Sequence, residues 1–152
     1  MSGARITITV DDAAVRAQLE RLLARVQHPT DALREVGEVL QQSTQRRFAT
    51  ETAPDGTHWA PNSPVTLARK TSRQILTDSG LLSDTIRYQL TADRQGVAVG
   101  SNRVYAAMQQ FGGTTAQHPQ LWGDIPARQF LGLSATDRTT ILDIFTDYLG
   151  SA

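Results

Sequence analysis

The sequence predicts an α+β fold, in which a small antiparallel sheet is packed by two long N-terminal helices and a C-terminal helix. Three short stretches, residues 4–10, 84–90 and 96–100, alternate apolar and polar side chains as half-buried strands do. Three longer stretches instead carry apolar residues at helical spacing, which indicates helices with one inward face. The sheet is therefore expected to contain an N-terminal strand and a hairpin. We expect the whole chain, 1–152, to form a single domain with long loops.

Length and composition exclude several classes of protein. A chain of 152 residues can bury one ordinary core. Its 15 Lys and Arg balance 15 Asp and Glu, so it lacks the positive charge of a dedicated nucleic-acid-binding protein. The absence of cysteine excludes disulfides, a thiol nucleophile and Cys-ligated metals, and is typical of folding in the cytoplasm. No apolar run approaches the roughly 20 residues of a membrane span, and we expect no signal peptide at the N-terminus.

The chain is poor in hydrophobic residues. They make up 39% of it, beside roughly 45–50% in ordinary soluble domains, a figure that also counts glycine. Two explanations stay open at this point. A partner subunit can supply part of the burial, or long exposed loops can lower the apolar share by themselves.

The N-terminal part is expected to consist of a strand and two helices. The strand occupies 4–10, an aspartate at 11–12 can cap the first helix, and His28-Pro29 ends it. The second helix begins at 30–31. Charges on the two helices nearly balance, and we expect their polar faces, Arg47 included, to be solvated. The apolar stripes are Val15, Leu19, Leu22, Leu23 and Val26 in the first helix and, facing inward, Leu33, Val36, Leu40, Thr44 and Phe48 in the second.

A proline-rich segment, residues 49–70, follows the second helix and is called the arm below. Irregular segments of about 20 residues are uncommon in compact domains unless they are functional or disordered. Within the arm, Pro54-Asp55-Gly56 can form a tight turn with Gly56 at positive φ. This turn would project Trp59 toward an apolar seat, because so large a ring is expected to dock. We therefore interpret the arm as a structured functional segment.

Two further elements are expected before the C-terminal region. Gly80 can begin the short segment that feeds the hairpin, which predicts that Leu81 or Leu82 lies in the core. Residues 104–111 favour a short helix that ends at Gly112-Gly113.

An irregular stretch, residues 112–128, begins with a Gly-rich loop at 112–124. It ends in Ile125-Pro126-Ala127-Arg128, which should be extended because a residue before proline avoids the helical region. A stiff backbone then holds Arg128, whose fork of donors suits a carboxylate or backbone carbonyls. A salt bridge within the chain and a contact between subunits are equal alternatives for it.

A C-terminal amphipathic helix closes the chain. Ser134 and Asp137 have the spacing of a capping box in its acidic form, so the helix is expected to begin there. Its apolar residues are Ile141, Leu142, Ile144, Phe145, Tyr148 and Leu149.

Signatures of catalysis and metal binding are missing. The three histidines, His28, His58 and His118, form no metal-binding pair, and the phosphate-binding, dinucleotide-binding and nucleophile-elbow motifs are absent. A small excess of basic residues in 46–103 is explained by a solvated face, with a weak phosphate-facing patch as the alternative. We expect no catalytic, cofactor-binding or metal-binding residues and no cofactor. Turn and capping roles explain the loop acids Glu51, Asp55, Asp78, Asp84 and Asp124.

Four segments in this order resemble the phage virion morphogenesis family, the tail completion proteins of Mu-like and related contractile-tailed phages. They are RRFATETAPDGTHWAPNSPVTLARK, ILTDSGLLSDTIRYQ, VAVGSNRVYAAMQQFGG and IPARQFLGLS, and together they cover about residues 46–134. One departure is that the family often has a histidine where this chain has Gln109, which weakens any titrating or metal-binding role there.

The resemblance implies a non-enzymatic structural protein of the neck or the head-proximal tail end. It would complete the tail or join head to tail as a ring around the DNA path, a hexamer by the symmetry of the tail, with DNA present only as the passing genome. Its partners would be copies of itself and other neck and tail proteins, without a membrane. It would assemble in the host cytoplasm and reside in the virion. A tail terminator ring is the alternative; a nucleic-acid-binding assembly factor and a small hydrolase fit less well.

The motif residues that the resemblance and the turn chemistry single out are candidates for assembly contacts. The arm and the Gly-rich loop are the candidate segments. The individual residues are Pro54, Asp55, Gly56, Trp59, Gly80, Leu81, Tyr105, Phe111, Gly112, Pro126, Arg128 and Phe130.

Overall fold

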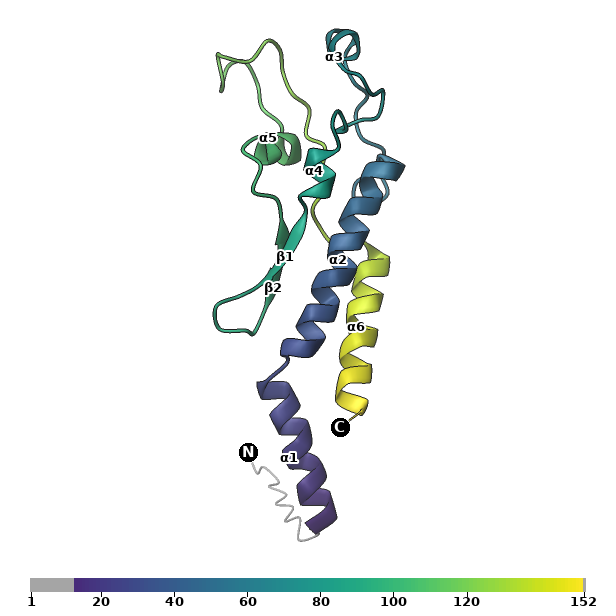
Figure 1. The fold of residues 1–152 in the computed structure, drawn as a ribbon, viewed down its shortest axis with the longest axis vertical. Helices are drawn as coiled ribbons and strands as arrows, with labels where there is room; N and C mark the ends of the chain where they lie inside the picture. The colour runs from purple at the N-terminus through teal and green to yellow at the C-terminus, as the bar shows by residue number, and fades with distance from the viewer. Residues whose placement is uncertain (1–12, 152) are drawn as a thin grey trace, which may run out of the picture.

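The computed structural model describes residues 13–151, which form an α+β fold (Figure 1). The predicted N-terminal strand at 4–10 and the predicted cap at 11–12 lie outside the described residues. Within the described part, the two strands form one antiparallel sheet. The elements are α1 (Ala13–Gln27), α2 (Thr30–Thr50), α3 (Pro64–Arg69), α4 (Leu81–Asp84), β1 (Arg87–Leu90), β2 (Val97–Gly100), α5 (Ala106–Phe111) and α6 (Ala135–Gly150).

Helix α2 is the centre of the fold. Helix α6 lies beside it on one side and the β1–β2 hairpin lies against it on another (Figure 1). The predicted inward stripe of α2 is confirmed, since Leu33, Val36, Thr44 and Phe48 are buried and Leu40 is partly buried. The chain breaks between α1 and α2 at His28-Pro29, where the sequence predicts it.

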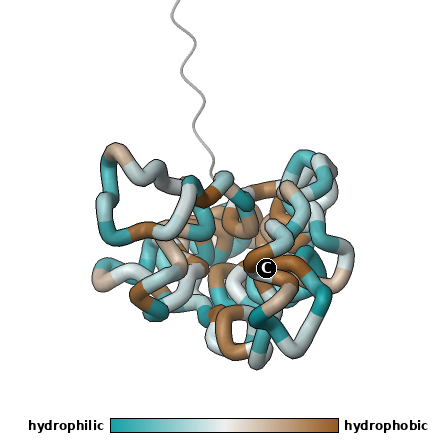
Figure 2. Tube along the Cα trace, turned by 90° about the horizontal axis from the view of Figure 1, so that it is seen from above, coloured by the Kyte–Doolittle hydropathy of each residue, from teal (hydrophilic) through white to brown (hydrophobic). Residues whose placement is uncertain are grey.

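Two apolar clusters are stacked along α2. One joins α2 to α6 and the hairpin through Ala32, Val36 and Ile144. The other lies at the end of the molecule where the irregular segments gather, residues 51–80 and 101–134, which we call the loop end (Figure 1). Seen down the long axis, peripheral loops are teal or white over much of their length (Figure 2). The buried residues of the loop-end cluster are Phe48, Trp59, Ile75, Leu82, Ile86, Ala106 and Phe130.

Helix α1 forms where its apolar spacing predicts, yet none of its residues is buried against the described part of the chain. It continues past the end of the hairpin and contacts α6 near its own C-terminus (Figure 1). There Arg25 donates to the Tyr148 carbonyl and to Ser151. The apolar stripe of α1 is exposed at Val15, Leu19, Leu23 and Val26 because no described element extends along it.

The hairpin is confirmed, with Tyr88 opposite Val99, but it is shorter than predicted. The predicted strand begins at residue 84, but Asp84 ends helix α4 and β1 begins only at Arg87, after the fully buried Ile86. Gly80 stands before α4 with φ of 82°, a left-handed conformation that glycine adopts at little cost. Of the two leucines, Leu82 is the core residue and Leu81 is exposed.

The arm is less irregular than predicted. Helix α2 runs through Thr50, and Pro64–Arg69 forms helix α3. Ser63 caps α3 by accepting a hydrogen bond from the Thr66 backbone N–H, with Pro64 in the first turn. Proline at this position fits a helix start, since its missing N–H would have no partner there.

Gly37 allows α2 to approach the sheet closely. A Cβ added there would lie 2.4 Å from Cδ2 of Tyr88, much closer than side chains pack. Gly37→Ala should therefore lower the free energy of unfolding by about 1–3 kcal/mol through overpacking, although alanine alone favours a helix by about 1 kcal/mol. Chemical denaturation checks this. In a Tyr88→Ala background the same change should be neutral or stabilising; an equal loss in both backgrounds would contradict the contact.

The capping box of α6 is confirmed and forms part of a larger network. Ser134 Oγ accepts from the Asp137 N–H, and Asp137 Oδ2 accepts from the Ser134 N–H. Asp137 also pairs with Arg47 of α2, and both side chains are buried. The expectation that Arg47 is solvated is therefore wrong. The sequence feature that could have predicted this burial is the position of Arg47, one turn beyond Thr44 and beside the buried Phe48 on the inward face of α2.

Candidate assembly site

Trp59 anchors the arm in the apolar cluster of the loop end. Its side chain is 5% exposed, and its indole N–H donates to the Gln129 carbonyl at 2.9 Å. Its ring meets Phe48 edge to face with centroids 5.5 Å apart, and Phe48 contacts Phe130 at the same centroid distance. The predicted docking of Trp59 is confirmed, and its seat is within the chain.

Arg128 fastens the arm a second time. Its Nε donates to the Ala60 carbonyl and its Nη2 to the Pro61 carbonyl, each at 2.8 Å, and the residue is 8% exposed. Burial lowers the pKa of Arg128 below its ordinary value, yet guanidinium remains charged in proteins. Among the described residues, this geometry is not that of a salt bridge. The fork instead holds two consecutive backbone carbonyls of the arm.

Gln110 holds the segment that carries Arg128. Its Oε1 accepts from the N–H groups of Phe130 and Leu131, both at 3.0 Å, and its Nε2 donates to the Leu131 carbonyl. One side chain therefore satisfies three backbone groups next to the buried Phe130. No local pattern in the sequence indicates this role, because it depends on residues twenty positions away.

The Pro54-Asp55-Gly56 turn has the predicted form. Gly56 has φ of 88° and its N–H donates to the Ala53 carbonyl at 2.9 Å. Asp55 Oδ1 accepts from the Thr57 N–H, which is the turn role expected for this acid. Gly132 lies against the turn, since a Cβ there would approach Pro54 Cγ to 2.9 Å.

The Gly-rich loop is closed at its base. Gly113 and Ile125 exchange two backbone hydrogen bonds of 2.9 and 2.7 Å. Gly112 ends α5 with φ of 72°, and a Cβ there would lie 2.7 Å from the Ala127 nitrogen. Only glycine fits so close to the 125–127 backbone, which explains why this motif position needs it.

A groove of about 780 Å³ runs between the arm, α4, α5 and the segment 124–126. It brings together five of the predicted motif residues, which come from distant parts of the sequence. Trp59 and Phe130 belong to the buried cluster instead, and Phe111 is not among the lining residues. The motif residues along the groove are Gly80, Leu81, Tyr105, Pro126 and Arg128.

The other charged residues of the groove are held by contacts inside the chain. Asp78 Oδ1 accepts from the N–H and hydroxyl of Thr71, and Asp124 Oδ1 does the same for Thr115. Lys70 Nζ donates to the Gln74 carbonyl at 2.6 Å. These contacts confirm the loop-structuring role predicted for both acids.

Large side chains are exposed around the loop end. Phe111 is 78% exposed, and Trp122, near the end of the Gly-rich loop, is 81% exposed. Arg69 of α3 lies over the Trp122 ring at 4.0 Å, so the Gly-rich loop contacts the arm. Trp122 was not among the predicted residues, although a tryptophan in a polar, glycine-rich loop could have indicated a contact site. Exposed aromatic and arginine residues are typical of protein–protein contacts.

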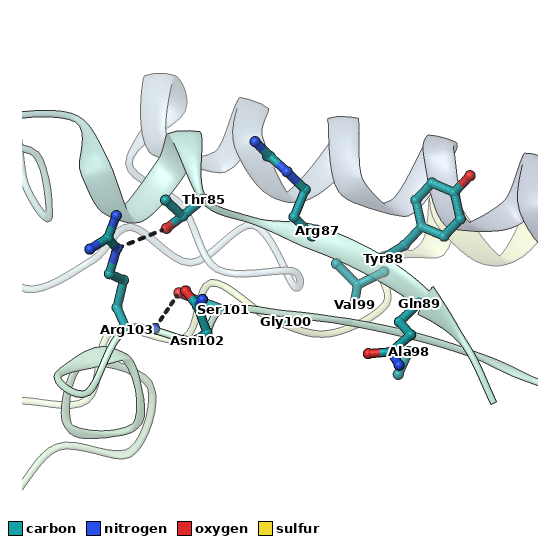
Figure 3. A pocket seen from close by; sticks show the side chains of 10 residues that line it. All are labelled: Thr85, Arg87, Tyr88, Gln89, Ala98, Val99, Gly100, Ser101, Asn102 and Arg103. Atoms are coloured by element: carbon teal, nitrogen blue, oxygen red, sulfur yellow. Dashed lines mark hydrogen bonds between the residues drawn. The ribbon is translucent and has the colours of Figure 1, made fainter. Parts of the chain in front are cut away.

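A second hollow lies along the hairpin and the segment that follows it (Figure 3). Its two arginines are engaged in the chain: Arg103 Nε donates to Thr85 Oγ1, and Arg87 Nη1 donates to the carbonyls of Asp84 and Ile86. Two members of the basic excess noted in the sequence therefore make local contacts within the chain.

Within residues 13–151 we find no cluster of three or more His, Cys, Asp or Glu arranged to hold a metal ion. The helices of this same range include none with the length and hydrophobicity needed to span a bilayer.

The chain is similar to known phage proteins. A protein of Escherichia phage Mu named "Putative capsid assembly protein G" is 28% identical over 151 residues, which cover 97% of this chain and 96% of the relative. No solved structure matches the chain. The sequence model of the phage virion morphogenesis family matches residues 10–150. Because that match spans nearly the whole chain, the protein belongs to the phage virion morphogenesis family and has a role in assembling the phage virion.

Proposed function

We propose that this protein is a structural component of the phage neck or the head-proximal end of the tail. It completes the tail and joins it to the head as a ring of identical subunits, a hexamer, around the path of the DNA. Its partners are other copies of itself and neighbouring neck and tail proteins, and it acts without catalysis or a cofactor.

The observation that carries this proposal is the construction of the loop end. Polar groups of three side chains, Trp59, Arg128 and Gln110, are hydrogen-bonded to backbone segments of the same chain. Large apolar side chains nevertheless stay exposed elsewhere on the loop end, with Phe111 and Trp122 more than three-quarters exposed. A surface that is both held in shape and apolar suits docking to other proteins.

Two further observations support the proposal. The name of the Mu relative refers to capsid assembly, which agrees with a position where head and tail meet. The balance of 15 basic and 15 acidic residues suits a ring that lets DNA pass instead of binding it.

Labelling the protein in purified virions tests its position. A tag is fused to the C-terminus and located by electron microscopy. We expect the label at the junction of head and tail. A label at the distal tip of the tail, or virions that lack the protein, would overturn the proposed position. A label at the tail end of isolated tails made without heads would favour the terminator role over the connector.

Arg128→Ala should release the arm without unfolding the chain. Hydrogen bonds to charged groups contribute about 1.5–3 kcal/mol, so tryptic cleavage after Arg69 and Lys70 should become about 10- to 150-fold faster. Arg128→Lys should behave similarly, because lysine lacks the fork that spans two carbonyls. Phages with either variant should accumulate unjoined heads and tails.

The matched control is Arg138→Ala, an exposed arginine on α6 outside the loop end. It should change neither arm cleavage nor infectivity. Full infectivity of the Arg128→Ala phage, with arm cleavage at the wild-type rate, would show that the contact has no part in assembly.

A further inference from the structure

Phe111 lies on a different face of α5 from the groove. Tyr105 and Gln109, one helical turn apart, both line the groove. Each residue advances about 100° around a helix, so Phe111 lies about 200° from Gln109 and faces away from it. The exposure of Phe111, 78%, agrees with that placement. In Figure 1, α5 stands at one flank of the loop end, with α3 and the arm at the other.

The groove is suited to a neutral apolar side chain. Its volume of about 780 Å³ lies within the range of small-ligand sites. The groove can therefore hold one aromatic ring together with the residues that flank that ring in the inserting chain. Pro61, Pro64, Leu81, Tyr105 and Pro126 supply apolar lining. The charged side chains that line the groove are already hydrogen-bonded within their own chain, so the groove does not require a charged ligand to balance them.

Exposed apolar side chains of the loop end are available for both sides of a subunit contact. Buried aromatic side chains each cover about 150–250 Å², and a standard interface buries about 800 Å² on each partner. Three aromatic and four aliphatic side chains, divided between the two sides of the contact, can supply part of that area on each partner. They are Val65, Leu67, Leu81, Val104, Tyr105, Phe111 and Trp122.

We infer that Phe111 of one subunit inserts into the groove of the next identical subunit, beside Leu81. The inference rests on the proposed ring and names the contact that builds it. Because the inserting side chain and the receiving groove lie on different faces of α5, we expect a heterologous contact, in which each subunit can contact two neighbours. Such a contact closes into a ring when the rotation between neighbours allows it.

The absence of cysteine makes a direct crosslinking test possible. Phe111→Cys and Leu81→Cys are made in separate chains, mixed at a concentration where the wild type self-associates, and treated with a short bismaleimide. The mixture should give a covalent dimer, while each variant alone should stay monomeric on a denaturing gel. A chain with both changes should give a ladder whose largest closed product reports the number of subunits in the ring.

Leu142→Cys mixed with Phe111→Cys is the matched control, since Leu142 is 67% exposed but lies on α6. It should give less than a tenth of the dimer. Both loop-end positions are exposed, and unchanged melting temperatures will confirm that the variants fold.

Two results would overturn the contact: a Phe111→Cys chain that crosslinks to itself, or a mixture with Leu81→Cys that yields no more dimer than the control. If the wild type associates and these results are found, the ring is built through another face and the proposed function stands. A wild type that stays monomeric at every concentration and in the virion would overturn the ring itself.

Discussion

Trp59→Ala should lower the free energy of unfolding by about 3–5 kcal/mol, the usual cost of truncating a buried aromatic side chain to alanine. The ring is 5% exposed and packs against Phe48 inside the loop-end cluster. Removing it opens a cavity between the arm and the rest of the chain, and it also leaves the Gln129 carbonyl without its donor. Urea or guanidinium denaturation of the purified protein measures the loss.

Two further variants separate the contributions at this site. Trp59→Phe keeps an aromatic ring but loses the indole N–H, so it should cost less than Trp59→Ala, with about 1 kcal/mol due to the lost hydrogen bond. Trp122→Ala is the matched control, because that ring is 81% exposed and should matter for assembly more than for stability. An unchanged midpoint for Trp59→Ala would mean that the arm is not anchored through this ring.

Elements that depend on neighbouring residues were predictable from the sequence. The alternation around Tyr88 and Val99 predicts the hairpin, and Ser134 with Asp137 predicts the start of α6. The positive φ of Gly56 follows from the turn chemistry of its own three residues. In each of these cases the deciding contacts are a few positions apart or face each other across one turn.

Contacts between distant segments were predictable only in part. The stiff approach to Arg128 indicates that its fork meets a fixed partner, but not that the partner is the backbone of the arm. The spacing in α1 predicts a helix, although it does not reveal that the described part of the chain leaves its stripe exposed. Gln110 and Gly37 owe their roles to segments that approach only in the folded chain.

Arg47→Ala should also lower the free energy of unfolding by about 3–5 kcal/mol, because it leaves Asp137 buried without its cation. The two side chains are 7% and 5% exposed, and Arg47 Nη1 also donates to the Phe130 carbonyl at 2.9 Å. The pair thereby joins α2, α6 and the segment that carries Arg128. Arg46→Ala is the matched control, since Arg46 is the exposed neighbour on the same helix. Equal denaturation midpoints for the two variants would contradict a stabilising role for the pair.

The pH dependence of stability gives a second measure of the same pair. Burial opposes ionisation of Asp137, but hydrogen bonds from Ser43 and Ser134 and the charge of Arg47 outweigh it and lower its pKa. A carboxyl whose pKa is lower in the folded state stabilises the fold above its unfolded pKa, near 4, and loses that contribution as the pH falls through the folded value. The wild type should therefore lose stability below about pH 4. Asp137→Asn should be less stable at neutral pH and show a smaller loss below pH 4; an identical acid slope in both proteins would assign the acid sensitivity to other carboxyl groups.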